Sequence, residues 1–144
     1  MKKTTLRQNV QNTDRTWFLV DADNKTLGEI AVIVANKLRG KNKVTFTPHA
    51  DGGDYVVILN VEKVRVTGNK EEDKKYYRHS GVLGNLKTES LKTVRLKDPK
   101  RILRNAVSGM LPKNRLRALQ LKRLILVIGN QNPHEAQKAE ILNI

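Results

Sequence analysis

The sequence predicts an α/β domain built on a parallel sheet, and three observations indicate it. Two strongly apolar runs, residues 16–20 and 54–61, are strand candidates, and a stretch with helical periodicity lies between them. A strand, a helix and a second strand that is apolar on both faces form a βαβ unit, whose strands pair in parallel through a right-handed crossover. A further apolar run, residues 124–128, supplies another buried strand. The expected architecture is a compact α/β layer with basic extensions.

The chain is 144 residues long, which corresponds to one domain large enough for its own core. Residues 1–15 are polar and basic and have no periodicity, so we interpret them as a basic N-terminal arm. Residues 16–144 then form the single α/β domain. Residues 1–7 begin with basic side chains but no apolar core follows them, so we do not expect a secretory signal.

The first helix is predicted to begin at Thr26 and to end at Gly40. Thr26 is followed three positions later by Glu29, the spacing of a capping box in which the hydroxyl accepts from an early helical N–H and the carboxylate reaches back. Gly40 supplies the stop. The apolar face of this helix has three- and four-residue spacing, is broadened by Val32 and Ile33, and consists of Leu27, Ile30, Ala31, Val34 and Leu38.

Three segments in the middle of the chain are assigned by their composition. Residues 47–53 contain a proline and paired glycines and are predicted to form a loop. Residues 64–66 alternate in polarity and are predicted to form a short strand. Residues 68–87 are polar, charged and interrupted by glycine, so we expect a long exposed loop, and loops of that length without structure of their own are usually functional or disordered.

The C-terminal third is predicted to hold three helices and a strand. Asp98 and Pro99 mark a helix start, with Asp as the cap and Pro in the first turn. Pro112 is expected to begin a second helix, which bears Leu116 and Leu119, and residues 132–133 are expected to cap a short last helix. The buried face of the helix that follows Pro99 is predicted to consist of Ile102, Leu103, Ala106, Val107 and Met110.

Positive charge is the strongest clue to function. The chain has 28 Lys and Arg against 14 Asp and Glu, a net charge of +14, and its pI is about 10.3. Residues 87–123 alone contain twelve of these cations and only two acids, Glu89 and Asp98. A solvated helical surface normally balances its cations with nearby acids. The excess therefore favours a polyanionic partner, whose phosphates the cations neutralise while counterions are released.

An anionic membrane is the alternative partner, and two observations disfavour it. The longest apolar runs have about five residues, whereas a spanning helix needs roughly 20. A helix that lies on a membrane needs a free apolar face, but the apolar face within residues 102–110 is required for the core. We therefore predict nucleic acid and no membrane. No DNA-binding motif is visible, and a basic arm with long loops suits an irregularly folded RNA, recognised by its shape and phosphates.

Enzyme chemistry has little support in the sequence. Cysteine is absent, which excludes disulfides and thiolate metal sites. His49, Asp51 and Asp54 could be metal ligands, but we interpret the segment as a tight turn in which Asp accepts from backbone N–H groups. Neither G-x-x-x-x-G-K-[ST] nor G-x-G-x-x-G occurs, and no spacing indicates a catalytic triad. We predict no cofactor, and an α/β enzyme that uses His49 and Asp51 is the least favoured hypothesis.

Residues 76–79 place two tyrosines, an arginine and a histidine together on a segment that we expect to be exposed. Aromatic rings and guanidinium planes are the surfaces on which unstacked RNA bases pack. The alternative is that one tyrosine packs into the core and Arg78 is merely solvated. The basic segment that follows favours RNA contact.

Six motifs occur in order along the chain, and together they resemble the bacterial large-subunit ribosomal protein L13 family. Each motif alone is weak, but six in register are highly specific, and the resemblance runs from about Trp17 to Ile144. The motifs are residues 38–43 (LRGKNK), 46–51 (FTPHAD), 53–56 (GDYV), 67–70 (TGNK), 76–81 (YYRHSG) and 109–112 (GMLP).

The resemblance implies a three-layer α/β/α fold with a four-stranded parallel sheet. It also implies a structural, non-enzymatic role in the cytoplasmic ribosome: binding to large-subunit rRNA early in subunit assembly, beside other large-subunit proteins. Some family members are linked to translational repression through messenger RNA, and a regulator that binds a messenger hairpin is kept as the alternative function.

The sequence departs from the family pattern at several positions. Glu29 stands where the family usually has a cation, and Arg117 lies in a segment where the family commonly has Leu-Gly-Arg-Ala. Asn132 replaces the first histidine of a His-Pro-His, and residues 82–85 replace a common Tyr-Pro-Gly-Gly. These changes put individual contacts in question, especially at positions 29 and 117.

The candidate RNA contacts fall into three groups, after the first helix, in the 68–87 segment and in the basic C-terminal part. They are Arg39, Lys41, Lys43 and His49; Tyr77, Arg78 and His79; and Arg101, Arg104, Lys113, Arg115, Arg117, Lys122 and Arg123.

Overall fold

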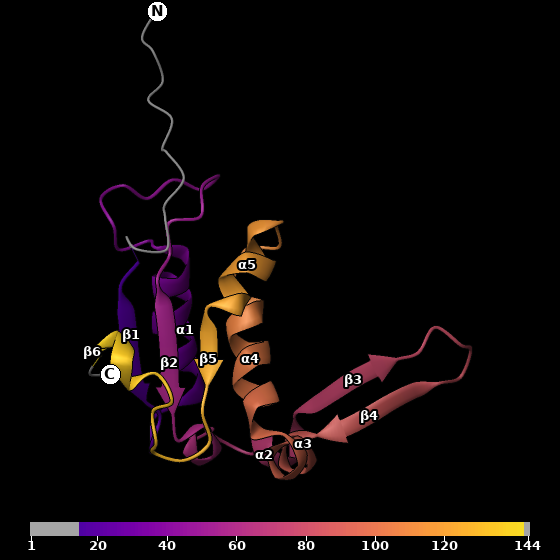
Figure 1. Ribbon diagram of the computed structural model, residues 1–144. Helices are drawn as coiled ribbons and strands as arrows, with labels where there is room; N and C mark the ends of the chain where they lie inside the picture. Colours follow the sequence, from indigo (N-terminus) through magenta and orange to yellow (C-terminus); the bar gives the residue numbers. More distant parts are fainter. Residues whose placement is uncertain (1–14, 143–144) are drawn as a thin grey trace, which may run out of the picture.

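The computed structural model describes residues 15–142, so the predicted N-terminal arm lies outside the described residues except for Arg15. The helices and strands follow one another along the chain as Figure 1 shows. They are β1 (Trp17–Asp21), α1 (Leu27–Arg39), β2 (Tyr55–Leu59), η2 (Val61–Lys63), α2 (Lys70–Asp73), β3 (Lys75–His79), β4 (Leu86–Ser90), α3 (Leu91–Lys97), α4 (Pro99–Met110), α5 (Leu116–Lys122), β5 (Leu124–Leu126), η3 (Glu135–Gln137) and β6 (Glu140–Ile141).

The main sheet has four parallel strands in the order β5-β2-β1-β6. Trp17 pairs with Tyr55, so β1 and β2 are aligned from their first residues, and Val56 pairs with Leu124 on the other side. The parallel pairing of β1 and β2 confirms the βαβ unit predicted from the sequence. The α/β class is also confirmed, and the sheet with five helices within residues 15–142 is consistent with the three-layer arrangement.

The core lies between one face of the sheet and helices α1 and α4, which run alongside the strands in Figure 1. Ile30, Val34 and Leu38 of α1 are fully buried, as the helical spacing predicts, and Val20 and Ile58 face them from the sheet. Burial of each such side chain is worth about 1.5–3 kcal/mol. Val32 is half exposed, so it does not broaden the buried face of α1 as expected.

The opposite face of the sheet begins with an aromatic pair. The rings of Trp17 and Tyr55 stack with their centroids 4.4 Å apart, which the strand register makes possible. The ring of His134 lies 5.5 Å from that of Trp17. The chain after β5 therefore packs against this end of the second face, and Figure 1 shows it crossing from β5 to β6.

The capping box predicted at the start of α1 does not form. Thr26 takes the N-cap position, but its hydroxyl makes no bond to the helix backbone and donates instead to the carboxylate of Glu29. The two side chains satisfy each other rather than the helix N–H groups. The predicted end is confirmed, because Gly40 caps α1 with φ +72°.

Residues 64–66 do not form a strand. Only a single parallel bridge joins Arg65 to Thr26, and it is held by bonds between Leu27 N and Arg65 O and between Arg65 N and Lys25 O, each 2.9 Å long. The neighbouring residues make no further strand pairing, so the bridge stays isolated.

The prediction of a loop over residues 68–87 is wrong. The segment contains helix α2 and the antiparallel hairpin of β3 and β4, which projects away from the body of the domain in Figure 1. Most side chains on both faces of the hairpin are exposed. Without a buried face, the sequence has no alternation of apolar and polar residues to reveal a strand.

The C-terminal elements differ from their predictions mainly at their boundaries. Helix α4 begins at Pro99 as expected, although the side chain of Asp98 makes no cap bond. Its last residue, Met110, is 40% exposed, whereas Ile102, Leu103 and Val107 are buried.

Helix α5 and the elements around it also shift. Helix α5 begins at Leu116 rather than at Pro112, and it buries Gln120 while Leu119 stays exposed. The last predicted helix is a short 3-10 turn, Glu135–Gln137. Helix α3 and the two-residue strand β6 had no assignment from the sequence.

Candidate nucleic-acid interface

The α1–β2 loop (residues 40–54) carries the first group of candidate cations and is held in place by glycine contacts. A Cβ on Gly40 would lie 2.7 Å from the carbonyl oxygen of Gly52, and one on Gly53 would lie 1.7 Å from that of Leu38. Both positions therefore exclude any side chain. Because Asp54 N also donates to Lys37 O at 3.2 Å, the end of the loop packs against the last turn of α1.

Asp51 joins this loop to a distant part of the chain. Its two carboxylate oxygens accept from Nη1 and Nη2 of Arg123 at 2.5 and 2.6 Å. The Arg123 side chain is only 7% exposed, and its Nη2 also donates to Leu38 O at 3.0 Å. Arg15 approaches from the other side, donating to Gly53 O at 2.6 Å. Asp51 is therefore an ion-pair partner of buried guanidinium groups.

Asp54 has a similar role at the end of the loop. It accepts from Thr16 N at 3.1 Å, as expected of a carboxylate that caps backbone N–H groups, and from Nζ of Lys43 at 2.5 Å. Within residues 15–142, no group of three or more His, Asp or Glu is arranged to hold a metal ion.

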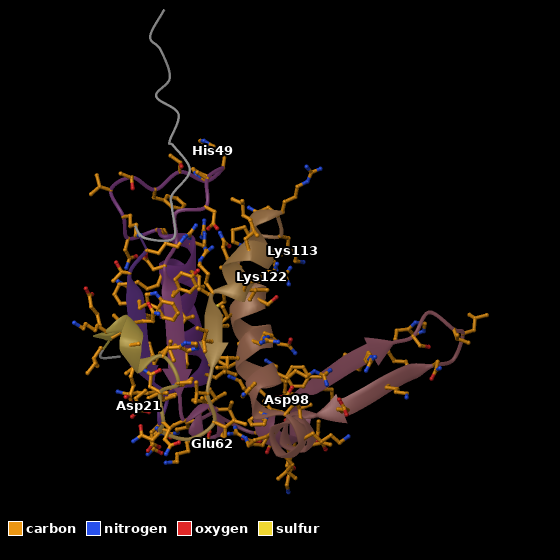
Figure 2. All side chains as sticks on the ribbon, viewed as in Figure 1. Asp21, His49, Glu62, Asp98, Lys113 and Lys122 are labelled. Carbon is orange, nitrogen blue, oxygen red and sulfur yellow. The ribbon has the colours of Figure 1, made fainter. Side chains whose placement is uncertain are left out.

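The loop turns its remaining basic side chains outward. Lys41 and His49 are exposed, and Figure 2 shows His49 at the outer edge of the loop. The guanidinium of Arg39 lies over the ring of Phe46, 5.6 Å from its centroid. The loop thus presents Lys41 and His49 freely, whereas Lys43 shares its charge with Asp54.

The basic residues around α5 lie at the same end of the domain as the α1–β2 loop. Lys113, Arg115 and Lys122 are exposed. Figure 2 shows Lys113 and Lys122 beside α5, at the opposite end of the domain from Asp21 and Glu62. We call Lys41, His49, Lys113, Arg115 and Lys122 the basic end.

Two other candidates near α4 and α5 have partners within the protein. Arg117 donates from Nε to Ser108 Oγ at 3.1 Å, and Arg101 donates to the carboxylate of Glu89 at 2.9 Å. Arg104 is exposed on α4. Arg123, in contrast, lies inside the protein and has no surface to offer.

The hairpin presents a second, separate group of candidates. Tyr77 is 64% exposed, and Arg78 and His79 are exposed beside it, whereas Tyr76 is partly buried and packs against the core. One tyrosine of the pair thus packs inward, as the alternative interpretation expected, and the other is exposed. The hairpin therefore carries exposed aromatic and cationic groups together, as the sequence predicts. It points away from the basic end in Figure 1, so the two groups form separate surfaces.

Ion pairs fix the base of the hairpin to the body. Glu89 of β4 accepts from Nζ of Lys97 and from Nη1 of Arg101, each at 2.9 Å. The bonds from Lys97, and secondarily from Arg101, hold the pKa of Glu89 below its ordinary value. Arg95 donates to Glu62 O and Val64 O, at 3.0 and 2.9 Å, and connects α3 to the segment before α2. Arg95 had no predicted role, because its partners are backbone oxygens far away in the sequence.

A cavity of about 690 Å³ lies between the start of α1, the segment around α2 and the end of α4. Its lining combines apolar side chains with the basic residues Arg65, Lys70 and Lys74. Two of the six motifs contribute to its lining, through Thr67 and Lys70 and through Gly109 and Met110, and Gly28 and Glu29 line it from the start of α1.

The departures from the family pattern are accommodated locally. Glu29 is bound by Thr26, Arg117 is bound by Ser108, and Asn132 Oδ1 accepts from the backbone N of His134 at 2.9 Å. These three side chains thus have partners within the chain, whereas Val82 and Leu83 in the fourth departure are exposed.

The fold and the surface together define a class: a basic α/β protein with exposed cations gathered at one end of the domain (Figure 2). Among residues 15–142, no helix combines the length and the apolar character that crossing a membrane requires.

Comparison with known proteins gives the family. The family described as Ribosomal protein L13 matches residues 15–133. The large ribosomal subunit protein uL13 of Teredinibacter turnerae is 46% identical over 140 residues, covering 97% of this chain and 99% of its own. The protein of the same name from Lawsonia intracellularis is 52% identical over 128 residues, 89% of each chain. That from Xanthomonas campestris pv. campestris is 47% identical over 141 residues, 98% of this chain and 99% of its own.

The chain belongs to the ribosomal protein L13 family. The resemblance seen in the sequence is thereby confirmed. The family consists of ribosomal proteins rather than enzymes, so the prediction of a non-enzyme with its place in the cytoplasmic ribosome is confirmed as well.

Proposed function

We propose that the protein is a structural constituent of the large ribosomal subunit that binds large-subunit rRNA and joins early in assembly. The relatives that cover almost all of this chain are named as large ribosomal subunit proteins. Neighbouring large-subunit proteins are its expected protein partners.

The observation that carries rRNA binding is the basic end. Lys41, Lys113, Arg115 and Lys122 are exposed cations from two segments far apart in sequence, the α1–β2 loop and residues 113–122. Among the described residues, none of these four side chains takes part in a salt bridge. Unpaired cations gathered on one end neutralise backbone phosphates and release counterions, which is the main source of affinity for nucleic acid.

The candidate contacts now divide by their availability. Lys41, His49, Arg104, Lys113, Arg115 and Lys122 act directly on phosphate, and Tyr77, Arg78 and His79 act from the hairpin. Arg39, Lys43, Arg101 and Arg117 already have partners within the protein and contribute through what remains of their charge. Arg123 supports the interface by holding Asp51 and makes no RNA contact of its own.

Sucrose-gradient fractionation of a native lysate tests this function. The protein is expected to sediment with large subunits and assembly precursors in low salt and to stay there in moderate salt. If it remains with free protein in low salt, the proposed function fails. In that case, tight binding of the free protein to a short messenger hairpin would establish the alternative function.

A further inference from the structure

The hairpin places two permanent cations face to face. Its register pairs Arg78 with Lys87, and residues paired directly across two antiparallel strands project to the same face. The neighbouring pairs, Tyr77 with Thr88 and His79 with Leu86, project to the other face. One side of the hairpin is therefore cationic near its tip, and the other side carries aromatic and apolar groups.

This arrangement works against the stability of the free hairpin. Like charges placed directly opposite each other destabilise a strand pair, and a two-stranded hairpin has little stability to spare. Glu89, the only acid in the hairpin sequence, is bound to Lys97 and Arg101 at the base. Within residues 15–142, no carboxylate forms a salt bridge with Arg78 or Lys87. The protein itself leaves this repulsion unrelieved.

A polar cleft of about 460 Å³ lies at the same place. Arg78, His79, Ser80, Asn85 and Lys87 line it. Gly81 N donates to Nδ1 of His79 at 2.9 Å, so this nitrogen is engaged within the turn and Nε2 is the ring nitrogen that remains for a ligand. The cleft thus combines the basic residues Arg78 and Lys87 with the polar residues Ser80 and Asn85 and with His79, a set that suits an oxyanion.

We propose that this cleft holds one backbone phosphate of the bound RNA between Arg78 and Lys87. The proposal rests on the proposed function and adds Lys87 to the contacts. RNA is favoured over an isolated anion because Tyr77, on the opposite face of the same strand, is well exposed and offers a stacking surface for a base. A phosphate bound in the cleft also removes the repulsion, so the hairpin becomes more stable as the RNA binds.

The proposal predicts opposite effects of one substitution. Lys87→Glu replaces the repulsion with an attraction to Arg78, so the free hairpin becomes more stable and its amide protection rises by about two- to fivefold. The same change removes a phosphate contact and repels the phosphate. Affinity for rRNA falls, by about tenfold or more, and the salt dependence flattens by about one unit.

Lys75→Glu is the matched control. It makes the same change in net charge on the same hairpin, but Lys75 pairs with the uncharged Ser90 at the base. Amide exchange of the free full-length protein and binding to deproteinised large-subunit rRNA over a range of salt concentrations are measured for both variants. The expected result is that only Lys87→Glu raises protection, and that it reduces affinity several times more than Lys75→Glu.

Two results would contradict a phosphate site between Arg78 and Lys87 and leave the proposed function intact. One is that Lys87→Glu and Lys75→Glu weaken rRNA binding equally. The other is a photo-crosslinker at position 83 that captures protein rather than rRNA in the assembled subunit. Loss of binding by the wild-type protein as well would instead contradict the proposed function. A third result comes from titrating inorganic phosphate alone in parallel. Hairpin amide shifts with phosphate but none with RNA would mean a site for free oxyanions and not for RNA.

Discussion

Arg123 and Asp51 form a bidentate ion pair across 72 residues of sequence, with Nη–Oδ distances of 2.5 and 2.6 Å. The pair fastens the α1–β2 loop, which carries Lys41 and His49, to the residue just before β5. Arg123, although it is buried, thus helps to position Lys41 and His49, which lie on the surface.

Breaking this pair is expected to be costly. Asp51→Asn leaves Arg123 and Arg15 with uncompensated charges inside the protein, and loss of one partner of a buried pair lowers the free energy of unfolding by about 3–5 kcal/mol. Urea denaturation measures this free energy of unfolding. The control is Lys63→Ala, which breaks an exposed 3.6 Å pair with Asp23 and costs less than about 1 kcal/mol. Equal losses in the two variants would show that the Asp51 pair is not a structural support.

Two glycines are expected to respond in opposite directions to alanine. Gly53→Ala puts a Cβ 1.7 Å from Leu38 O, so the backbone must move and stability falls by at least about 2 kcal/mol. Gly28→Ala meets nothing within 4 Å and lies in α1, where alanine is favoured by up to about 1 kcal/mol. Thermal unfolding of both variants measures the difference. A stable Gly53→Ala protein would contradict the close packing of the loop.

The basic end is expected to determine the salt dependence of RNA binding. Replacement of Lys113, Arg115 and Lys122 by alanine removes three phosphate contacts, so the slope of log affinity against log salt flattens by about two to three units. Filter binding to large-subunit rRNA measures the slope. The control combines Lys63→Ala with Lys25→Ala, near the opposite end of the domain. A slope that changes by the same amount per removed cation in both variants would mean that net charge, and not the basic end, drives binding.

Glu89 is expected to make the base of the hairpin sensitive to acid. Bonds from Lys97 and Arg101 lower the pKa of Glu89 in the folded protein. The stability that these bonds provide is therefore present above the ordinary carboxyl pKa and is lost as the pH falls through the lowered value. Hairpin amide protection should decline below about pH 4 in the wild type. In Glu89→Gln the protection is lower at neutral pH, and this part of the decline is missing. Glu72→Gln, on α2, should keep the wild-type profile.

The sequence predicted the elements that have at least one buried face. Strands β1, β2 and β5 are short continuous apolar runs, and helix α1 repeats apolar residues every three or four positions, because these side chains pack into the interior. Both patterns are visible without a structure. The hairpin has no such face, so its strands were predicted as a loop. Strand β6, with two residues, is too short for any pattern.

The candidate site was predicted by residue type but not by environment. Charge counting included Arg123 with the surface cations, because nothing in its neighbours shows that Asp51 lies beside it in the fold. Lys87 was not predicted as an individual contact, again because its neighbours in the sequence do not show its partner in the fold. Its significance depends on facing Arg78, and strand register appears only when the chain is folded.

The order of strands in the sheet has a consequence for the synthesis of the protein. The first two strands made, β1 and β2, occupy the centre, and their outer neighbours β6 and β5 are the last. Until residues 124–141 have left the ribosome that makes them, both edges of the β1–β2 pair are open to pairing with other chains. A newly made copy of this basic protein therefore closes its sheet only when almost its whole length is available.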